Sequence, residues 1–185
     1  MSWLDEVEAA FGVAPEQGFG PPTVDVESAG WLAAVTTARD DLGCGFFDYL
    51  TAVDEVDEGY ALVVHLARPG VGHVESLLIR TRVPNDAATV ACVCAVYAGA
   101  GWHERETHEM FGIDFDVDLD PLLLPDGFEG HPLRKEFVLA SRVAKAWPGA
   151  KEPGESDADS AHSPGRRRIR PPGVPEPGEW GPQDE

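Results

Sequence analysis

The chain has 185 residues, 43% of them hydrophobic, which is enough for one domain of ordinary size with an appendage. Its 33 acidic residues outnumber its 14 basic ones, and the net charge of -19 would repel the phosphates of nucleic acids and of anionic lipid headgroups. No apolar run approaches the roughly 20 residues that a membrane-spanning helix needs. Nucleic-acid binding and direct membrane insertion are therefore both disfavoured.

The start of the chain and its cysteines bear on the cellular compartment. The first eleven residues are acidic and amphipathic, rather than basic and then apolar, so they do not resemble a signal peptide. Three cysteines, an odd number without paired spacing, favour a reducing environment. We therefore expect a cytoplasmic protein.

The first elements follow from hydrophobic spacing. Residues 2–11 place apolar side chains at helical intervals, and Gly12 ends this short helix. Residues 23–27 alternate valine with acidic residues, which predicts a strand with one face in water. Ser28 is placed to cap a second helix, whose apolar stripe runs over residues 31–42.

Three strands are expected next, because the periodicity changes from helical to alternating. Residues 45–53, 60–66 and 74–83 are rich in β-favouring side chains and are separated by short turns, which predicts an antiparallel meander. Arg80 and Arg82 alternate with apolar residues in the last strand and should lie on its outer face.

A helix is then predicted over residues 86–98, with an apolar stripe that includes Cys94 and with Cys92 on another side. Together these elements predict an α+β fold. It would consist of a small mixed, largely antiparallel sheet with helices packed mainly on one face, followed by an extended C-terminal tail.

The most informative stretch runs from Gly101 to Leu139. Residues 102–111 contain neither proline nor glycine and predict a short helix with Trp102 and Met110 along one side, stopped by Gly112. Along that helix Arg105 precedes Glu109 by one turn and Glu104 precedes His108, so two exposed ion pairs are expected. The following segment combines prolines and glycines with many leucines and phenylalanines. A loop with so many apolar anchors should be held against another part of the protein.

Two motifs in this stretch carry a family resemblance. Residues 104–106 with 109–113 read ERE and EMFGI, and residues 127–135 read GFEGHPLRK. Together they resemble the 30 kDa subunit (the C subunit) of respiratory NADH-quinone oxidoreductase, or complex I. The sequence departs from the family pattern at His108, at Glu109 and over residues 116–121, which suggests a divergent branch. The signature residues, expected at a partner interface, are Glu104, Arg105, Glu106, Glu109, Met110, Phe111, Gly112, Gly127, Phe128, Gly130, His131, Pro132, Leu133, Arg134 and Lys135.

The resemblance implies a non-catalytic structural subunit in the peripheral arm of this translocase. Such a subunit would position the quinone-binding and iron-sulfur subunits for electron transfer from NADH to quinone. It would pack against the 49 kDa-type (D-type) subunit on the cytoplasmic side of the plasma membrane and touch the membrane only through partners. Iron-sulfur clusters, flavin and quinone would be held by those partners. An equivalent subunit of a membrane-bound hydrogenase, or of another donor:quinone complex, is the alternative.

Six of the polar signature residues have two interpretations. They could form salt bridges that tie the helix at 102–111 to the loop at 127–137, or they could face a neighbouring subunit near the quinone site. Neither interpretation requires catalysis in this chain. The six are Glu104, Arg105, Glu106, His131, Arg134 and Lys135.

No cofactor or metal site is expected from the motifs. His103-Glu104 lacks the second histidine of a zinc-protease helix, because position 107 is threonine. Phosphate-binding loops, catalytic triads and dinucleotide fingerprints are missing from the sequence. On the predicted helix Cys92 and Cys94 would point about 160° apart and could not share a metal, which favours structural thiols. The acidic residues of 104–120 leave one other hypothesis, a stand-alone acidic metalloenzyme.

The last part of the chain has a different composition. We expect a folded domain over residues 1–147 and a tail over 148–185, which holds half of the 16 prolines and few aliphatic side chains. Ordering some 30 residues costs on the order of 30–60 kcal/mol of backbone entropy. Three apolar anchors, at about 1.5–3 kcal/mol each, do not offset that cost. The tail is therefore expected to become ordered only on a partner, through Ile169, Val174 and Trp180.

Overall fold

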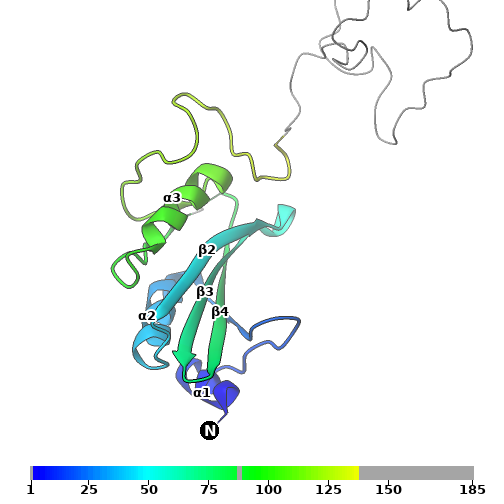
Figure 1. The fold of residues 1–185 in the computed structure, drawn as a ribbon. Coiled ribbons are helices and arrows are strands. Elements are labelled where there is room, and N and C mark those ends of the chain that lie inside the picture. Colours follow the sequence, from blue (N-terminus) through cyan, green and yellow to red (C-terminus); the bar gives the residue numbers. More distant parts are fainter. Residues whose placement is uncertain (1, 87–88, 138–185) are drawn as a thin grey trace, which may run out of the picture. The chain divides into compact units, whose positions relative to one another are not determined.

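The computed structural model describes residues 2–86 and 89–137 and confirms the predicted α+β class (Figure 1). Four strands form a sheet in the spatial order β1-β4-β3-β2, in which β1 lies parallel to β4 and the other neighbours are antiparallel. The elements are α1 (Trp3–Phe11), β1 (Thr23–Val26), η1 (Ser28–Gly30), α2 (Trp31–Asp40), β2 (Phe46–Asp54), η2 (Val56–Glu58), β3 (Tyr60–Gly70), β4 (His73–Val83), β5 (Thr89–Val90), α3 (Ala100–Phe111) and β6 (Asp114–Phe115).

The core begins as a row of aliphatic side chains that crosses all four strands. Leu50 on β2 lies opposite Val64 on β3, Val64 opposite Ile79 on β4, and Ile79 opposite Val24 on β1. All four side chains are buried. The same hydrophobic cluster takes in Val7, Trp31, Val35 and Phe111 from the three α-helices. The helices therefore pack mainly on one face of the sheet, as predicted.

The other face of the sheet carries charge. Arg80 binds both carboxylate oxygens of Asp25, at 2.6 and 2.8 Å, and also Glu16 at 2.8 Å. Arg82 pairs with Glu55 and Glu58. Both arginines thus lie on the outer face, where the alternation in the sequence placed them. The meander is also confirmed, although β3 continues through Pro69 before the chain turns.

The first two helices follow the sequence closely, with one correction. In α1, Ser2 and Asp5 form a reciprocal capping box, and Gly12 ends the helix with left-handed backbone geometry. The expected cap of α2 by Ser28 is wrong. Ser28 instead begins the 3-10 turn η1, and the helix starts after Gly30 without a side-chain cap.

The predicted helix over residues 86–98 is also wrong. Thr89 and Val90 instead form β5, which pairs in parallel with β6, and turns then lead to α3. The pairing strand lies beyond α3 in the sequence, so periodicity could not reveal it. Two β-branched residues were the only local sign of extended backbone.

Among the helices of residues 2–86 and 89–137, none has the length and apolar character needed to cross a bilayer. The proposed domain end at residue 147, the tail over 148–185 and its anchors Ile169, Val174 and Trp180 lie outside the described residues.

Candidate functional site

Helix α3 occupies the predicted position but turns a different side toward the core. Gly112 ends it as expected, with φ of 74° and its N–H donating to the carbonyl of His108 at 2.8 Å. The expected apolar side is wrong, because Trp102 is 63% exposed and Met110 is only partly buried. The buried residues are Ala100, Glu104, Thr107 and Phe111.

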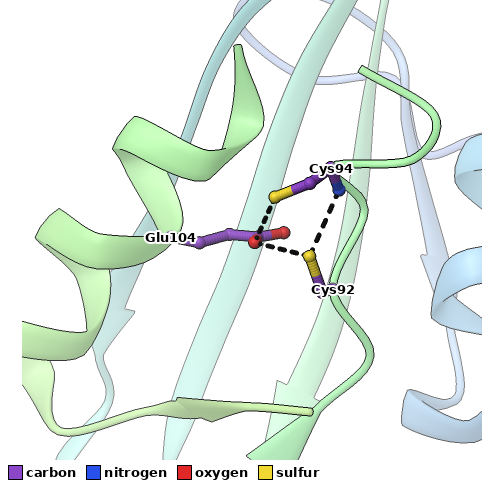
Figure 2. A group of neighbouring side chains, drawn as sticks. All are labelled: Cys92, Cys94 and Glu104. Carbon is purple, nitrogen blue, oxygen red and sulfur yellow. Dashed lines mark hydrogen bonds between the residues drawn. The ribbon is translucent and has the colours of Figure 1, made fainter. Parts of the chain in front are cut away.

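Glu104 is the unexpected member of this buried face, since its side chain is completely enclosed. One carboxylate oxygen, Oε1, accepts a hydrogen bond from the N–H of Val93 at 2.7 Å. The other, Oε2, accepts from the thiols of Cys92 at 3.0 Å and Cys94 at 2.9 Å. Figure 2 shows both sulfur atoms directed from one loop toward the carboxylate on α3. The expected pair between Glu104 and His108 on an exposed face is therefore wrong.

The two thiols converge because residues 91–99 are not helical. The prediction that Cys92 and Cys94 point away from each other is overturned, since their sulfurs and a Glu104 oxygen all lie within 4.8 Å of one another. Burial raises the pKa of both thiols, and the bond to the Glu104 carboxylate raises it further. Cys44 lies apart in the core, where burial raises its pKa to about 11. All three cysteines are therefore protonated thiols at neutral pH.

Farther along α3, Glu109 fixes the first half of the loop that follows the helix. Its carboxylate accepts hydrogen bonds from the N–H groups of Leu122 and Leu123, at 2.8 and 2.7 Å, and longer ones from Leu124. Partial burial raises the pKa of Glu109, but these donors outweigh it, so the pKa lies below its ordinary value. The carboxylate is thereby held in its charged form at neutral pH.

Arg105 acts on the same part of the loop. Its guanidinium donates to the backbone carbonyls of Asp120 at 2.8 Å and Pro121 at 2.5 Å. The predicted ion pair between Arg105 and Glu109 is not formed, although the two residues are spaced for one. Both side chains instead bind the loop backbone.

The second half of the loop is tied to the C-terminal end of α3. His131 lies with Nδ1 2.8 Å from the carbonyl of Glu109, and Arg134 donates from Nε to the carbonyl of Phe111 at 2.6 Å. The N–H of Leu133 donates to the carbonyl of Met110 at 3.1 Å. Carbonyls in the last turn of a helix lack partners within the helix, and a cation there also opposes the negative end of the helix dipole.

Most of the polar signature residues are thus used within the chain, but not in the salt bridges that one of the two interpretations proposed. Contacts between the loop and helix backbone replace pairs between His131, Arg134 and the glutamates of α3. Glu106 is exposed, as is the side chain of Lys135. The N–H of Lys135 donates to Asp54 at 2.7 Å. This bond, with one from Val56, lowers the pKa of Asp54 and joins the loop to the end of β2.

The remaining signature residues shape the loop itself. Gly127 and Gly130 have positive φ, which glycine adopts without steric cost. Phe128 stacks on Phe137 with ring centroids 6.0 Å apart, and Pro132 is half-buried. Up to residue 137 the loop therefore has a defined course, although it contains no helix or strand after β6.

Helix α3 and this fixed loop leave large apolar side chains in solvent. We use the name docking residues for Trp102, Leu123, Phe128 and Leu133, which are 63%, 56%, 41% and 52% exposed. Trp102 and Leu123 line one shallow groove together with Leu122, whereas Phe128 lines a second groove beside His131. Large apolar side chains held in place but left uncovered are typical of a binding surface.

The other candidate metal residues do not come together. His103 faces the carbonyl of Leu50 at 3.2 Å and lies edge-on to Phe47, so it is a packing residue. In the part of the chain that the structure describes, only Cys92, Cys94 and Glu104 gather three possible metal ligands. The acidic residues of 114–120 form no such group there. The Cys-x-Cys spacing was the one sequence signal of this cluster. It was not interpreted as a site because the helix predicted over residues 86–98 would have pointed the two thiols apart.

Comparison with known proteins gives consistent results. Residues 24–143 match the model of the family described as "Respiratory-chain NADH dehydrogenase, 30 Kd subunit". The C subunit of NADH-quinone oxidoreductase from Rhizobium etli is 38% identical over 149 residues, which cover 77% of this chain and 72% of the relative.

Two solved structures share the fold. A chain of the membrane-bound sulfane sulfur reductase, an archaeal respiratory membrane complex, aligns with a TM-score of 0.63 at 23% identity, covering 74% of this chain and 83% of that one. A trypsin-resistant fragment of Nqo5 aligns with a TM-score of 0.53 at 24% identity, covering 63% of this chain and 96% of the fragment.

Proposed function

The chain belongs to the 30 kDa subunit family of the respiratory-chain NADH dehydrogenase, and from that premise we propose that it is a non-catalytic structural subunit of an NADH-quinone oxidoreductase. It lies in the peripheral arm and positions the quinone-binding and iron-sulfur subunits for electron transfer from NADH to quinone. Its contribution is geometric, since a redox centre must be held at a fixed place to work. The clusters, flavin and quinone of the reaction are held by partner subunits.

One observation supports this role above the others: an irregular loop is fixed to a helix by many specific bonds. Glu109, Arg105, His131 and Arg134 all bind backbone groups across the junction between α3 and the loop. Ordering such a segment costs about 1–2 kcal/mol per residue in backbone entropy. The result is a rigid surface that displays the docking residues, and a preformed surface avoids that entropic cost on association.

The partner in this proposal is the 49 kDa-type (D-type) subunit. The docking residues supply apolar anchors, and the exposed side chains of Glu106 and Lys135 are available for polar contacts. Contact with the membrane, on the cytoplasmic side, is made only through such partners.

The test is copurification of the full-length tagged chain with the D-type subunit from cells that express the complex. Leu123→Asp places a charge on an exposed docking residue and should reduce recovery of the D-type subunit by on the order of tenfold or more, since a buried unpaired charge costs several kcal/mol. Val71→Asp is the matched control, because Val71 is fully exposed in the β3–β4 turn, outside the loop.

Recovery of the D-type subunit with the unchanged chain and with Val71→Asp, but not with Leu123→Asp, supports the proposal. Equal recovery of the D-type subunit with both variants would show that the docking residues do not form the contact. Absence of the D-type subunit from every sample would reject the partner. Mass spectrometry of the copurified proteins also shows whether the donor is an NADH module or the hydrogenase of the alternative assignment.

A further inference from the structure

The loop between β5 and α3 brings two sulfur ligands, and α3 brings one oxygen ligand, to a single point. We propose that Cys92, Cys94 and Glu104 form a binding site for one thiophilic divalent cation of the Zn²⁺ class. The observations that support the site do not depend on the proposed assembly role. It also departs from the expectation that the chain holds no metal, because the part of that expectation that concerned Cys92 and Cys94 rested on a helix that the chain does not form.

The geometry requires little change for such a cation. A tetrahedral Zn²⁺ ion, with Zn–S of about 2.3 Å and Zn–O of about 2.1 Å, holds sulfur and oxygen ligands about 3.6 Å apart. The observed distances from Glu104 Oε2 are 3.0 Å to Cys92 Sγ and 2.9 Å to Cys94 Sγ. Each sulfur must therefore move away from the oxygen by roughly 0.6–0.7 Å, which rotation of the two loop side chains can supply. Cys92 and Cys94 are only partly buried, so an ion can reach them.

The chemistry of the buried carboxylate points the same way. Glu104 is completely enclosed, yet within the described residues it pairs with no lysine, arginine or histidine, and apart from one N–H its donors are two thiols. Thiols are weak hydrogen-bond donors, and a buried carboxylate normally requires a cation or several strong donors. A divalent cation would supply the missing positive charge. Two sulfurs with one carboxylate oxygen select Zn²⁺ over Mg²⁺ or Ca²⁺, which prefer oxygen ligands alone.

The backbone around the cysteines is already arranged to accept negative sulfur. The N–H of Cys94 donates to the sulfur of Cys92 at 3.3 Å, as the dashed line in Figure 2 shows. Such a bond grows stronger when the thiol becomes a thiolate. Gly101, at the start of α3, leaves room for the second sulfur, since a Cβ atom there would lie 3.3 Å from Cys94 Sγ.

The binding step exchanges protons for metal. Each thiol releases its proton to solvent as its sulfur bonds to the cation, while Glu104 contributes its carboxylate. Two thiolates and one carboxylate carry three negative charges, so Zn²⁺ leaves the site with a net charge of minus one. The fourth coordination position remains for water. The bound ion links the β5–α3 loop to the middle of α3 and so braces the helix that carries the docking residue Trp102.

The test measures metal retention by the purified full-length chain. The chain is incubated with excess Zn²⁺, passed through a desalting column and measured for zinc and protein; a parallel sample receives Co²⁺ for absorption spectroscopy. We expect one zinc per chain and, with cobalt, the intense near-ultraviolet absorption of thiolate-to-cobalt charge transfer. We also expect Zn²⁺ to slow alkylation of Cys92 and Cys94 until a chelator is added.

Three variants make the test specific. Cys92→Ser with Cys94→Ser keeps hydroxyl donors for Glu104, preserving the fold, but should lower zinc affinity by on the order of 100-fold or more because hydroxyl groups are poor zinc ligands. Glu104→Gln should lower the affinity by about tenfold or more, because the amide is a weak, neutral ligand. Cys44→Ala is the matched control, since it removes a thiol outside the cluster and should leave binding unchanged.

The outcomes separate clearly. Failure of the unchanged chain to retain zinc, or no thiolate signal with cobalt, overturns the site without bearing on assembly of the complex. Equal retention by the double serine variant would overturn the cysteines as ligands, and unchanged binding by Glu104→Gln would overturn the carboxylate ligand. Because alkylation and cobalt spectra are read on the unchanged chain, a variant that fails to fold does not remove the test.

Discussion

A single glycine determines how α3 and the following loop meet. Gly112 has φ of 74°, and a Cβ atom built there would lie 2.5 Å from His131 Nε2 and would also collide with the guanidinium of Arg134. The residue therefore meets two requirements at once. It permits the left-handed turn that ends the helix, and it leaves the space that the loop side chains occupy.

Replacing this glycine should cost more than the backbone geometry alone. Gly112→Ala is expected to lower the free energy of unfolding by about 2–4 kcal/mol, from left-handed strain and displacement of the two loop side chains. Gly127→Ala shares a positive φ, of 76°, but meets no atom within 4 Å. It should cost only about 1–2 kcal/mol. Urea denaturation of both variants measures the difference, and equal losses would contradict the packing explanation.

The charge of Glu109 makes the attachment of the loop to α3 dependent on pH. The pKa of Glu109 is lower in the folded protein than its ordinary value of 4.5. The stabilisation that Glu109 gives to the attachment of the loop is therefore fully present above pH 4.5. It is lost as the pH falls through the lowered pKa. Hydrogen-exchange protection of the Leu122 and Leu123 amides should fall over that range.

Glu109→Gln provides the control for this pH effect. Glutamine has the same size but no charge, so protection of the Leu122 and Leu123 amides should be lower near neutral pH and should no longer depend on pH below 4.5 through this group. An acid response identical to that of the unchanged chain would show that another group governs it.

At the scale of elements, one arginine joins α1 to the sheet. Arg68 on β3 donates to Glu6 of α1 at 2.7 Å and to the carbonyl of Leu42 at 3.1 Å, and it pairs with Glu75. Its guanidinium also lies 4.5 Å from the centre of the Trp3 ring. The four partners come from three separate segments, so the loss of this side chain should loosen α1 as a whole.

Arg68→Met is therefore expected to lower the free energy of unfolding by about 1–3 kcal/mol and to expose the α1–β1 connection to limited proteolysis. Arg82→Met is the matched control. Arg82 lies on the neighbouring strand and is 49% exposed, and its surface pairs should contribute about 0–1 kcal/mol. Equal proteolysis of the two variants would show that α1 is held by its apolar contacts alone.

Strands that pair with near neighbours in the chain were predictable from the sequence, and the strand that pairs with a distant one was not. The meander was predictable because β2, β3 and β4 pair with near neighbours in the chain, and their alternation matches a sheet with one buried face. The error over residues 86–98 arose because β5 pairs with a strand that lies beyond α3, with Thr89 opposite Asp114. The helical spacing of a few apolar residues is a weak local preference. Pairing with a strand that lies beyond α3 in the sequence outweighs it.

The site was predictable in outline only. The two motifs indicated that α3 and the loop at 127–137 lie together, and they do. Salt bridges were one of the two interpretations, whereas the actual partners of His131 and Arg134 are helix carbonyls. Any sequence provides such backbone groups, so no side-chain pattern indicates which of them will be bound. The buried face of α3 was missed because Glu104 reads as a surface residue. Its donors are two thiols and one backbone N–H from residues 92–94, which the predicted helix over 86–98 would not have brought to this carboxylate.

At the scale of the whole molecule, the described residues form a small sheet with helices on one face and a stiffened loop that presents apolar side chains. Such a molecule suits a positional role in a larger assembly. Variants that weaken docking should then reduce the amount of assembled complex, while each complex that does assemble should work normally.

Quinone reduction per assembled complex tests this central claim most directly. Membranes from cells carrying Leu123→Asp or the control Val71→Asp are assayed for NADH-dependent quinone reduction, and the complex is quantified through its D-type subunit. We predict that Leu123→Asp lowers total activity and the amount of complex in the same proportion, so that turnover per complex is unchanged. A normal amount of complex with reduced turnover would contradict the account, because the chain would then take part in the reaction itself.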